Sequence, residues 1–297
     1  MTSTSTPHKR PPNPSGRHPG TSVPDVASEL RRLMPRDRWL LDLLHQHQVF
    51  TTEQIAALGF DHVHTTRNRL NLLLGRQVLA RFRDAVRPGS QSWRWTPGWI
   101  GAAFVAYRDS QPVPRPATIA DRVNALSASP RLPHLLGVNG FFVDLAAHAR
   151  HTSGARLNVW WSERRCRDVA GDLAHPDGHG MWTEDGHTVS FWLEYDRATE
   201  ANHRVMEKLD GYHALHRATG LTHPVLIRMQ TARQETELHR RLPSHPAVTS
   251  GALTVATMSG DHTTHPAGAV WLPAGHSTRL RLAHLPALAT DATRAAA

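Results

Sequence analysis

The stretch FWLEYDR, residues 191–197, has the apolar and aromatic content of a buried strand, yet it carries Glu194 and Asp196 two positions apart. Side chains alternate between the two faces of a strand, so these carboxylates point to the same face. The other face is left to three packing residues, Phe191, Leu193 and Tyr195. Two unpaired acids on one buried face repel each other and are costly to bury, which indicates a specific role for them.

The segments around this stretch predict a mixed α/β domain over residues 121–285. We expect a helix over 133–152, a strand at ARLNVWWS (155–162), and two strands, GDLAHPDG (171–178) and HTVSFWLEYDR (187–197), flanking a turn at 184–186. The helix ATEANHRVMEKLDGYHALHRATG (198–220) and the buried strand HPVLIRMQ (223–230) follow, then a helix at 235–242 and a strand at 252–258. Helices alternating with apolar runs favour a central mixed sheet.

Carboxylates from neighbouring strands are expected to converge. If the strands on either side of the turn pair as a hairpin, Asp177 approaches Glu194. Such a pair suits Mg²⁺ or Mn²⁺, which keeps several waters and can assist cleavage of a phosphodiester. Glu163 is an additional candidate ligand, and Asp196 is expected to assist. Lys208, one of only two lysines among 34 basic residues, is the candidate for stabilising the phosphate in transit.

This layout is similar to the PD-(D/E)xK nuclease superfamily, which has the restriction-endonuclease-like fold. Pro176-Asp177 matches its "PD" and Glu194 its second acid, whereas the superfamily's lysine falls at Asp196. The resemblance implies a metal-dependent endonuclease with catalytic Asp177, Glu194, Asp196 and Lys208. Lys208, on the following helix, would replace the missing lysine.

The first third of the chain has the pattern of a DNA-binding module. Residues 1–100 hold 14 Lys and Arg against 7 Asp and Glu, in a chain of net charge +9. Helical patterns at 36–47, 52–60 and 62–79 precede two short runs, LARFR and SWRWT, joined by a segment with the turn signal Pro88-Gly89. Residues 36–97 resemble a winged helix-turn-helix, whose third helix enters the major groove of double-stranded DNA. The resemblance implies DNA contacts from the third helix and the wing by His64, Thr65, Arg67, Asn68, Arg69, Arg83, Arg87 and Arg94.

The remaining segments complete the predicted organisation. We expect a disordered basic arm over residues 1–34, the winged helix over 35–107, a proline-rich linker over 108–120 and a disordered tail over 286–297. No apolar run approaches the roughly 20 residues of a membrane span, and no secretory signal is evident. The single cysteine, Cys166, excludes a disulfide framework. We therefore expect a cytoplasmic protein without a small-molecule cofactor or a membrane partner, as a monomer or a homodimer.

A closer resemblance follows from several motifs in order: a winged helix, then PDG, LEYDRATE at 193–200 and KLDGY at 208–212. This series resembles the replication-relaxation family of plasmids and mobile elements, which includes MobC-type relaxases. The likeness covers residues 36 to about 230. It implies sequence-specific DNA nicking in plasmid replication or conjugative mobilisation.

Other interpretations stay open at this point. Asp177 in PDG is also an ordinary turn residue, and Glu194 and Asp196 could bond Arg197 or Arg204 in a structural network. The protein could be a non-enzymatic replication or transcription regulator with a degenerate nuclease-like domain, or a defence-type restriction nuclease. The His62-Val63-His64 motif of tyrosine relaxases lies in a helical pattern here, and no Gly-rich phosphate loop is present.

Overall fold

The N-terminal half consists of short helices packed around a small antiparallel sheet of order β1-β3-β2. In the computed structural model the described residues are 23–60, 62–84, 91–196, 202–260 and 265–285. The elements of this half are α1 (Val23–Arg31), α2 (Pro35–His47), β1 (Phe50–Thr51), α3 (Thr52–Gly59), α4 (Val63–Gly75), β2 (Leu79–Phe82), β3 (Arg94–Pro97), α5 (Trp99–Arg108) and α6 (Pro116–Ala128).

Local sequence signals account for the sharp start of α3. The Thr51 hydroxyl accepts a hydrogen bond from the Gln54 backbone N–H, and the Gln54 side chain accepts one from the Thr51 backbone N–H, which forms a capping box. Apolar residues at helical spacing on α2, α3 and α4 then meet around the buried Trp95 of β3. Their shared core is formed chiefly by Leu40, Leu41, Leu44, Ile55, Leu70 and Leu73.

The C-terminal half is built on a seven-stranded mixed sheet, within the described part of the chain, of order β10-β9-β8-β7-β6-β5-β4. β6, β7 and β8 run parallel, and the other neighbours pair antiparallel. The elements in chain order are α7 (Leu132–His151), β4 (Arg156–Ser162), α8 (Glu163–Ala170), β5 (Gly178–Glu184), β6 (His187–Tyr195), α9 (Asn202–Thr219), β7 (Val225–Met229), α10 (Ala232–Arg241), α11 (Pro246–Thr249), β8 (Val255–Ser259), β9 (Ala269–Pro273) and β10 (Leu280–Arg281).

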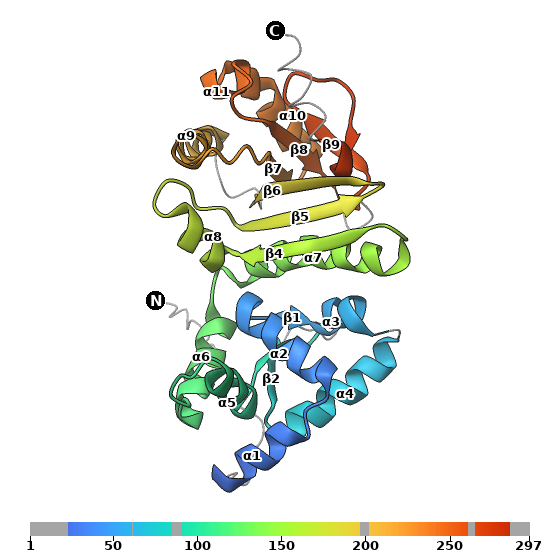
Figure 1. Ribbon diagram of the computed structural model, residues 1–297, viewed down its shortest axis with the longest axis vertical. Helices are drawn as coiled ribbons and strands as arrows, with labels where there is room; N and C mark the ends of the chain where they lie inside the picture. The colour runs from blue at the N-terminus through green and yellow to red at the C-terminus, as the bar shows by residue number, and fades with distance from the viewer. Residues whose placement is uncertain (1–22, 61, 85–90, 197–201, 261–264, 286–297) are drawn as a thin grey trace, which may run out of the picture.

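Helices cover both faces of this sheet, as Figure 1 shows. α7 packs on one face, where Phe142 contacts Phe191 and where Leu193 is also buried. α8, α9 and α10 cover the other face, whose core includes Trp192 of β6. The alternation along β6 therefore matches the expected one. Odd-numbered residues pack towards α7, and the even-numbered Glu194 lies on the α9 side.

The hairpin of β5 and β6 closes through the expected turn. Asp185 and Gly186 both have positive φ, at 51° and 77°, as a two-residue turn of the type that favours Asp-Gly requires. Gly180 permits close packing within this hairpin, because a Cβ there would lie 2.4 Å from the Phe191 ring. The register pairs Gly178 with Leu193, so Asp177 and Glu194 both lie next to the last pair, at the same end of the hairpin.

α7 also joins the two halves of the molecule, at the boundary visible in Figure 1. The side-chain amide of the buried Asn139 donates to the carbonyls of His47 and Val49, at 3.0 and 2.7 Å. Gln54 Nε2 donates to the carbonyl of Leu136 over 2.9 Å. Because buried polar groups are costly to leave unpaired, these bonds fix the first half against α7.

The mixed α/β class is as predicted, but several boundaries differ. Part of the predicted arm is ordered: α1 buries Val26, and Arg76, directly after α4, bonds Glu29 of α1. α6 begins inside the predicted linker, since a proline at the first helical position, Pro116, suits a helix start. The predicted strand 171–178 is wrong, because β5 begins only at Gly178.

Besides α1 and α6, the elements that were not foreseen include β1, α5, α8, α11, β9 and β10. The predicted tail at 286–297 and the first 22 residues of the predicted arm lie outside the described residues. No helix in the described ranges is long and apolar enough to cross a membrane.

Candidate functional site

The hairpin register brings Asp177 and Glu194 together at one end of the sheet. The Asp177 backbone N–H donates to the Leu193 carbonyl at 3.0 Å, so Asp177 is bonded to the residue directly before Glu194. Burial and the negative charge of Asp177 together raise the pKa of Glu194 to about 7, although Lys208 and Tyr212 oppose the shift. The two carboxylates therefore interact, and a bound cation would favour the ionised form of both.

Helix α9 supplies the two groups that hold the Glu194 carboxylate. Lys208 Nζ lies 2.8 Å from Oε2, and the Tyr212 hydroxyl donates to Oε1. The two residues are four positions apart and so share one face of the helix. The Glu194 side chain is only 6% exposed, whereas Lys208 is 38% exposed and can reach a ligand in solvent.

Asp177 is held from α7 and from the backbone of β6. His134 Nε2 lies 2.9 Å from Oδ1, and the Tyr195 backbone N–H donates to Oδ2 at 2.8 Å. Burial lowers the pKa of His134, but its hydrogen bond to Asp177 and the charge of that carboxylate outweigh the effect, so the pKa is raised overall. His134 therefore favours an imidazolium that pairs with Asp177.

Asp196 directly follows β6 and is buried, at 8% exposure. Its backbone N–H donates to the Arg228 carbonyl on the neighbouring strand β7. The Arg228 guanidinium stacks 4.8 Å from the centroid of the Tyr195 ring and donates to its hydroxyl. Asp196 thus lies at the same end of the sheet as Asp177 and Glu194.

The structure corrects the assignment of Glu163 as a metal ligand. Glu163 begins α8, where its carboxylate bonds Arg131 at 2.9 Å and Arg167 at 2.9 Å. These two arginines already neutralise it, so Glu163 does not complete a ligand set with the acid pair. Among the described residues, no group of three or more His, Cys, Asp or Glu side chains is arranged to hold a metal ion.

Two carboxylates alone can still hold Mg²⁺, because this ion keeps several of its waters and is often bound through one or two protein acids. Asp177 and Glu194 meet that requirement in residue type and proximity. Cys166, close by on α8, is fully buried, and burial raises the pKa of its thiol to about 12. Burial therefore disfavours the thiolate that a nucleophilic role requires.

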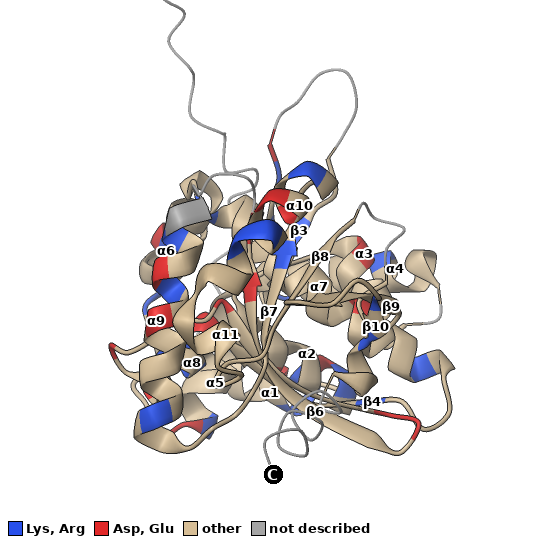
Figure 2. Ribbon diagram, turned by 90° about the horizontal axis from the view of Figure 1, so that it is seen from above, with Lys and Arg blue, Asp and Glu red and all other residues tan. Residues whose placement is uncertain are grey.

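A second surface, the exposed side of α4 with the neighbouring β2 and β3, carries the predicted DNA contacts. His64, Thr65, Arg67 and Asn68 are exposed on the first turns of α4. Arg67 is 61% exposed and lies 3.9 Å from Glu53 of α3. In Figure 2, an acidic segment of α3 and a basic segment of α4 lie next to each other. Arg83 is exposed at the end of β2.

Two predicted DNA contacts are engaged inside the protein instead. Arg69 forms a bidentate ion pair with the buried Asp37 of α2, and the hydrogen bonds of this pair raise the pKa of the guanidinium. Arg94 is only 13% exposed and bonds Asp84 at 3.0 Å. Arg69 is therefore corrected to a structural residue, because its ion pair ties α4 to α2. Arg87 lies outside the described residues.

The same surface contains Arg81, Asn71 and Trp93, which the sequence analysis did not single out. Arg81 and Arg83 lie over the Trp93 ring, at 4.0 and 4.1 Å from its centroid. Together with Arg67 and Asn71 they line a cavity of about 310 Å³ between α4 and the strands. The tryptophans that flank an arginine in SWRWT were the sequence signal for this cationic and aromatic surface. That Arg81 of β2 lies against Trp93 could not be predicted, because this contact depends on the register between β2 and β3.

Comparison with known protein families gives one match, which spans residues 41–226 under the description replication-relaxation. The chain belongs to the replication-relaxation family. A search of curated proteins finds no match. The matched region runs from α2 into β7, so it contains both the exposed side of α4 and the acid pair with Lys208 and Tyr212. Family membership implies a role in the replication or mobilisation of a plasmid or mobile element.

The bond from Tyr212 to Glu194 can be tested by stability measurements. Tyr212→Phe removes a donor from a buried carboxylate, so we expect the free energy of unfolding to fall by about 1–3 kcal/mol in chemical denaturation. Tyr107→Phe is the matched control, because Tyr107 is 57% exposed and its change should stay within about 0.5 kcal/mol. Equal effects of the two variants would contradict the assignment.

Proposed function

We propose that this member of the replication-relaxation family is a metal-dependent, sequence-specific DNA-nicking protein that acts in the cytoplasm on a plasmid or transfer origin. The observation that carries the proposal is the contact between Lys208 and Glu194 at 2.8 Å, beside Asp177. This site contains two carboxylates and a partly exposed ammonium group, and the chain belongs to a protein family associated with replication. These are the components that a phosphodiester-cleaving site needs.

Each residue of the site has a distinct task in this proposal. Asp177 and Glu194 would hold Mg²⁺ or Mn²⁺, which supplies activated water and stabilises charge on the phosphate. The Tyr212 hydroxyl and the His134 imidazole orient the two carboxylates. Lys208, 38% exposed, can turn its ammonium group from Glu194 towards the scissile phosphate.

The contact between Lys208 and Glu194 also accounts for the missing lysine of the PD-(D/E)xK pattern in this proposal. The superfamily's lysine position is occupied by Asp196, and an acid there would repel a phosphate. Lys208 reaches the second acid of the pattern, Glu194, from helix α9. We therefore propose that the lysine function has moved from the strand to the helix, within a restriction-endonuclease-like domain of MobC-type relaxase character.

DNA recognition is assigned to the N-terminal half as a winged helix-turn-helix. The order α2, α3, α4 followed by β2 and β3 is that of this motif, with α4 as the recognition helix. His64, Thr65, Arg67 and Asn68 would face the major groove, and Arg83 would bind a phosphate from the wing. Arg81 and Trp93 add a cationic and aromatic surface beside them.

Salt dependence of DNA affinity tests this assignment. Arg67→Ala and Arg83→Ala should each weaken binding to cognate origin DNA, and Arg83→Ala should also reduce the slope of log K against log salt by about 1, because it removes a phosphate contact. Arg233→Ala on α10 is the control, since Arg233 is exposed on the other half of the protein. If all three variants bind DNA with the wild-type affinity and slope, this surface does not contact DNA.

Nicking of supercoiled plasmid that carries the cognate origin tests the catalytic assignment. With Mg²⁺ or Mn²⁺ we expect the wild-type protein to yield open circles, and Asp177→Ala and Lys208→Ala to lower the rate roughly 100-fold or more. Glu237→Ala, which changes an exposed acid on α10, should nick at the wild-type rate. Plasmid left intact by the wild-type protein, or nicked equally by Asp177→Ala, would refute the proposal.

A second function is supported by a specific observation. Both oxygens of Glu194 already have partners within the protein, Lys208 and Tyr212, as in a charge-compensated structural site. Under this alternative the protein is a non-enzymatic replication regulator whose nuclease-like domain is degenerate. It requires that an Asp177→Ala/Glu194→Ala double variant retain both DNA affinity and replication activity.

A further inference from the structure

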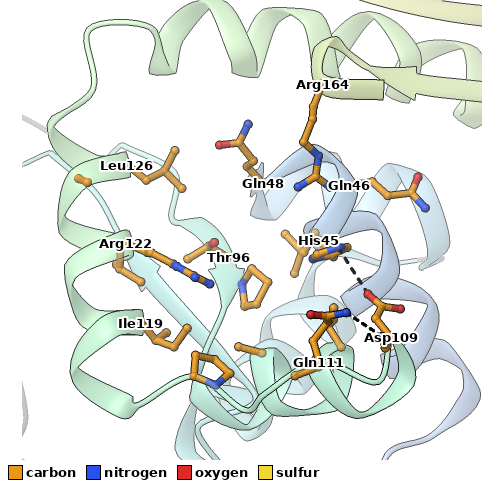
Figure 3. Close-up of a pocket in the computed structure, with 18 of the residues that line it drawn as sticks. His45, Gln46, Gln48, Thr96, Asp109, Gln111, Ile119, Arg122, Leu126 and Arg164 are labelled. Atoms are coloured by element: carbon orange, nitrogen blue, oxygen red, sulfur yellow. Dashed lines mark hydrogen bonds and ion pairs between the residues drawn. The ribbon is translucent and has the colours of Figure 1, made fainter. Parts of the chain in front are cut away.

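A cavity lies between α6 and the α2–α5 pair, and neither the acid pair nor α4 contributes to its lining. Its volume is about 760 Å³, and it is bordered by Thr96 and Pro97 of β3 and by Arg164 of α8 (Figure 3). None of the residues proposed for nicking or for DNA contact lines it. The proposed function therefore does not account for this cavity.

The walls of the cavity are apolar along α2, α5 and α6. The apolar side chains come from all three helices and include Leu44, Ala102, Val105, Ile119 and Leu126. Three amide side chains, Gln46, Gln48 and Gln111, add donors and acceptors around this surface. A volume of this size with mainly apolar walls and a few polar groups is typical of small-molecule sites.

Two arginines give the cavity an excess of positive charge. Arg122 extends from α6 and Arg164 from α8 into the space between the helices (Figure 3). Within the described residues, neither guanidinium has an acidic partner. The one acid of the lining, Asp109, is bonded by Arg108 at 2.7 and 3.0 Å.

The pKa of His45, at the edge of the cavity, is lowered by its surroundings. Burial lowers its pKa, and the positive charges of Arg164 and Arg108 lower it further. Its Nε2 lies 3.9 Å from Asp109, so this acid only partly offsets the arginines. Arg122 and Arg164 are both exposed and can pair with an anionic group in the cavity, because guanidinium binds phosphate or carboxylate with two parallel hydrogen bonds.

We propose that this cavity binds an organic anion of mononucleotide size, with its phosphate or carboxylate between Arg122 and Arg164. The planar body of the ligand lies on the apolar walls, and the glutamine amides bond its polar edge. Because Arg122 belongs to α6 and Arg164 to α8, the bound ligand bridges the helical N-terminal half and the sheet-containing C-terminal half.

Calorimetric titration of the full-length protein with adenosine 5′-monophosphate tests the proposal. We expect saturable binding that Arg164→Ala and Arg122→Ala each weaken roughly tenfold or more, through the loss of charge-assisted hydrogen bonds. Arg165→Ala is the matched control and should bind as the wild type does, because Arg165 is the next residue of α8 but does not line the cavity. Ala125→Trp should abolish binding by filling the space, and circular dichroism would verify that it folds.

Two further probes separate the parts of the ligand. Inorganic phosphate lacks the planar body and should bind at least roughly tenfold more weakly than the nucleotide, whereas 2-naphthoate, an aromatic carboxylate, should compete with it. Absence of nucleotide binding, equal affinity for phosphate alone, or equal losses in Arg164→Ala and Arg165→Ala would overturn the proposal. None of these measurements depends on DNA nicking.

Discussion

The register of the β5–β6 hairpin is the constraint on which the candidate site depends. Gly178 pairs with Leu193, and this pairing places Asp177 and Glu194 near each other at the open end of the hairpin. A slip of one residue would turn Glu194 to the α7 face, among the aromatic side chains around Phe191. The turn at Asp185-Gly186 and the close approach of Phe191 to Gly180 hold the register in place.

Burial of Glu194 sets the environment that follows from this register. A lone ionised acid in that position would be strongly disfavoured, and its pKa is accordingly raised to about 7. Lys208 and Tyr212 offset part of the cost, which explains why α9 presents both residues on one face. Helix α7 completes the arrangement: His134 near its start holds Asp177, and Asn139 one to two turns later is bonded to the N-terminal half. The acid pair and the proposed DNA-binding helices are thus attached to the same rigid element.

Much of this could be predicted from local patterns. The alternation in FWLEYDR places Phe191 and Leu193 on one face and Glu194 on the other, and the EDG turn predicts the hairpin. What the sequence could not provide was the set of long-range partners. His134 lies 43 positions before Asp177, and nothing in its neighbourhood distinguishes it from the other 21 histidines. Glu163 and Arg69 were misassigned for the same reason, since their ion pairs with Arg131 and Asp37 depend on helix packing.

The central claim is that Asp177 and Glu194 form a cation site and not only a structural ion-pair network. Calorimetric titration of Mn²⁺ into the wild-type protein, Glu194→Ala and Glu163→Ala tests it most directly. We predict one binding site in the wild-type protein, its loss in Glu194→Ala, and its retention in Glu163→Ala, because Arg131 and Arg167 already neutralise Glu163. No binding to the wild-type protein, or undiminished binding to Glu194→Ala, would contradict the account.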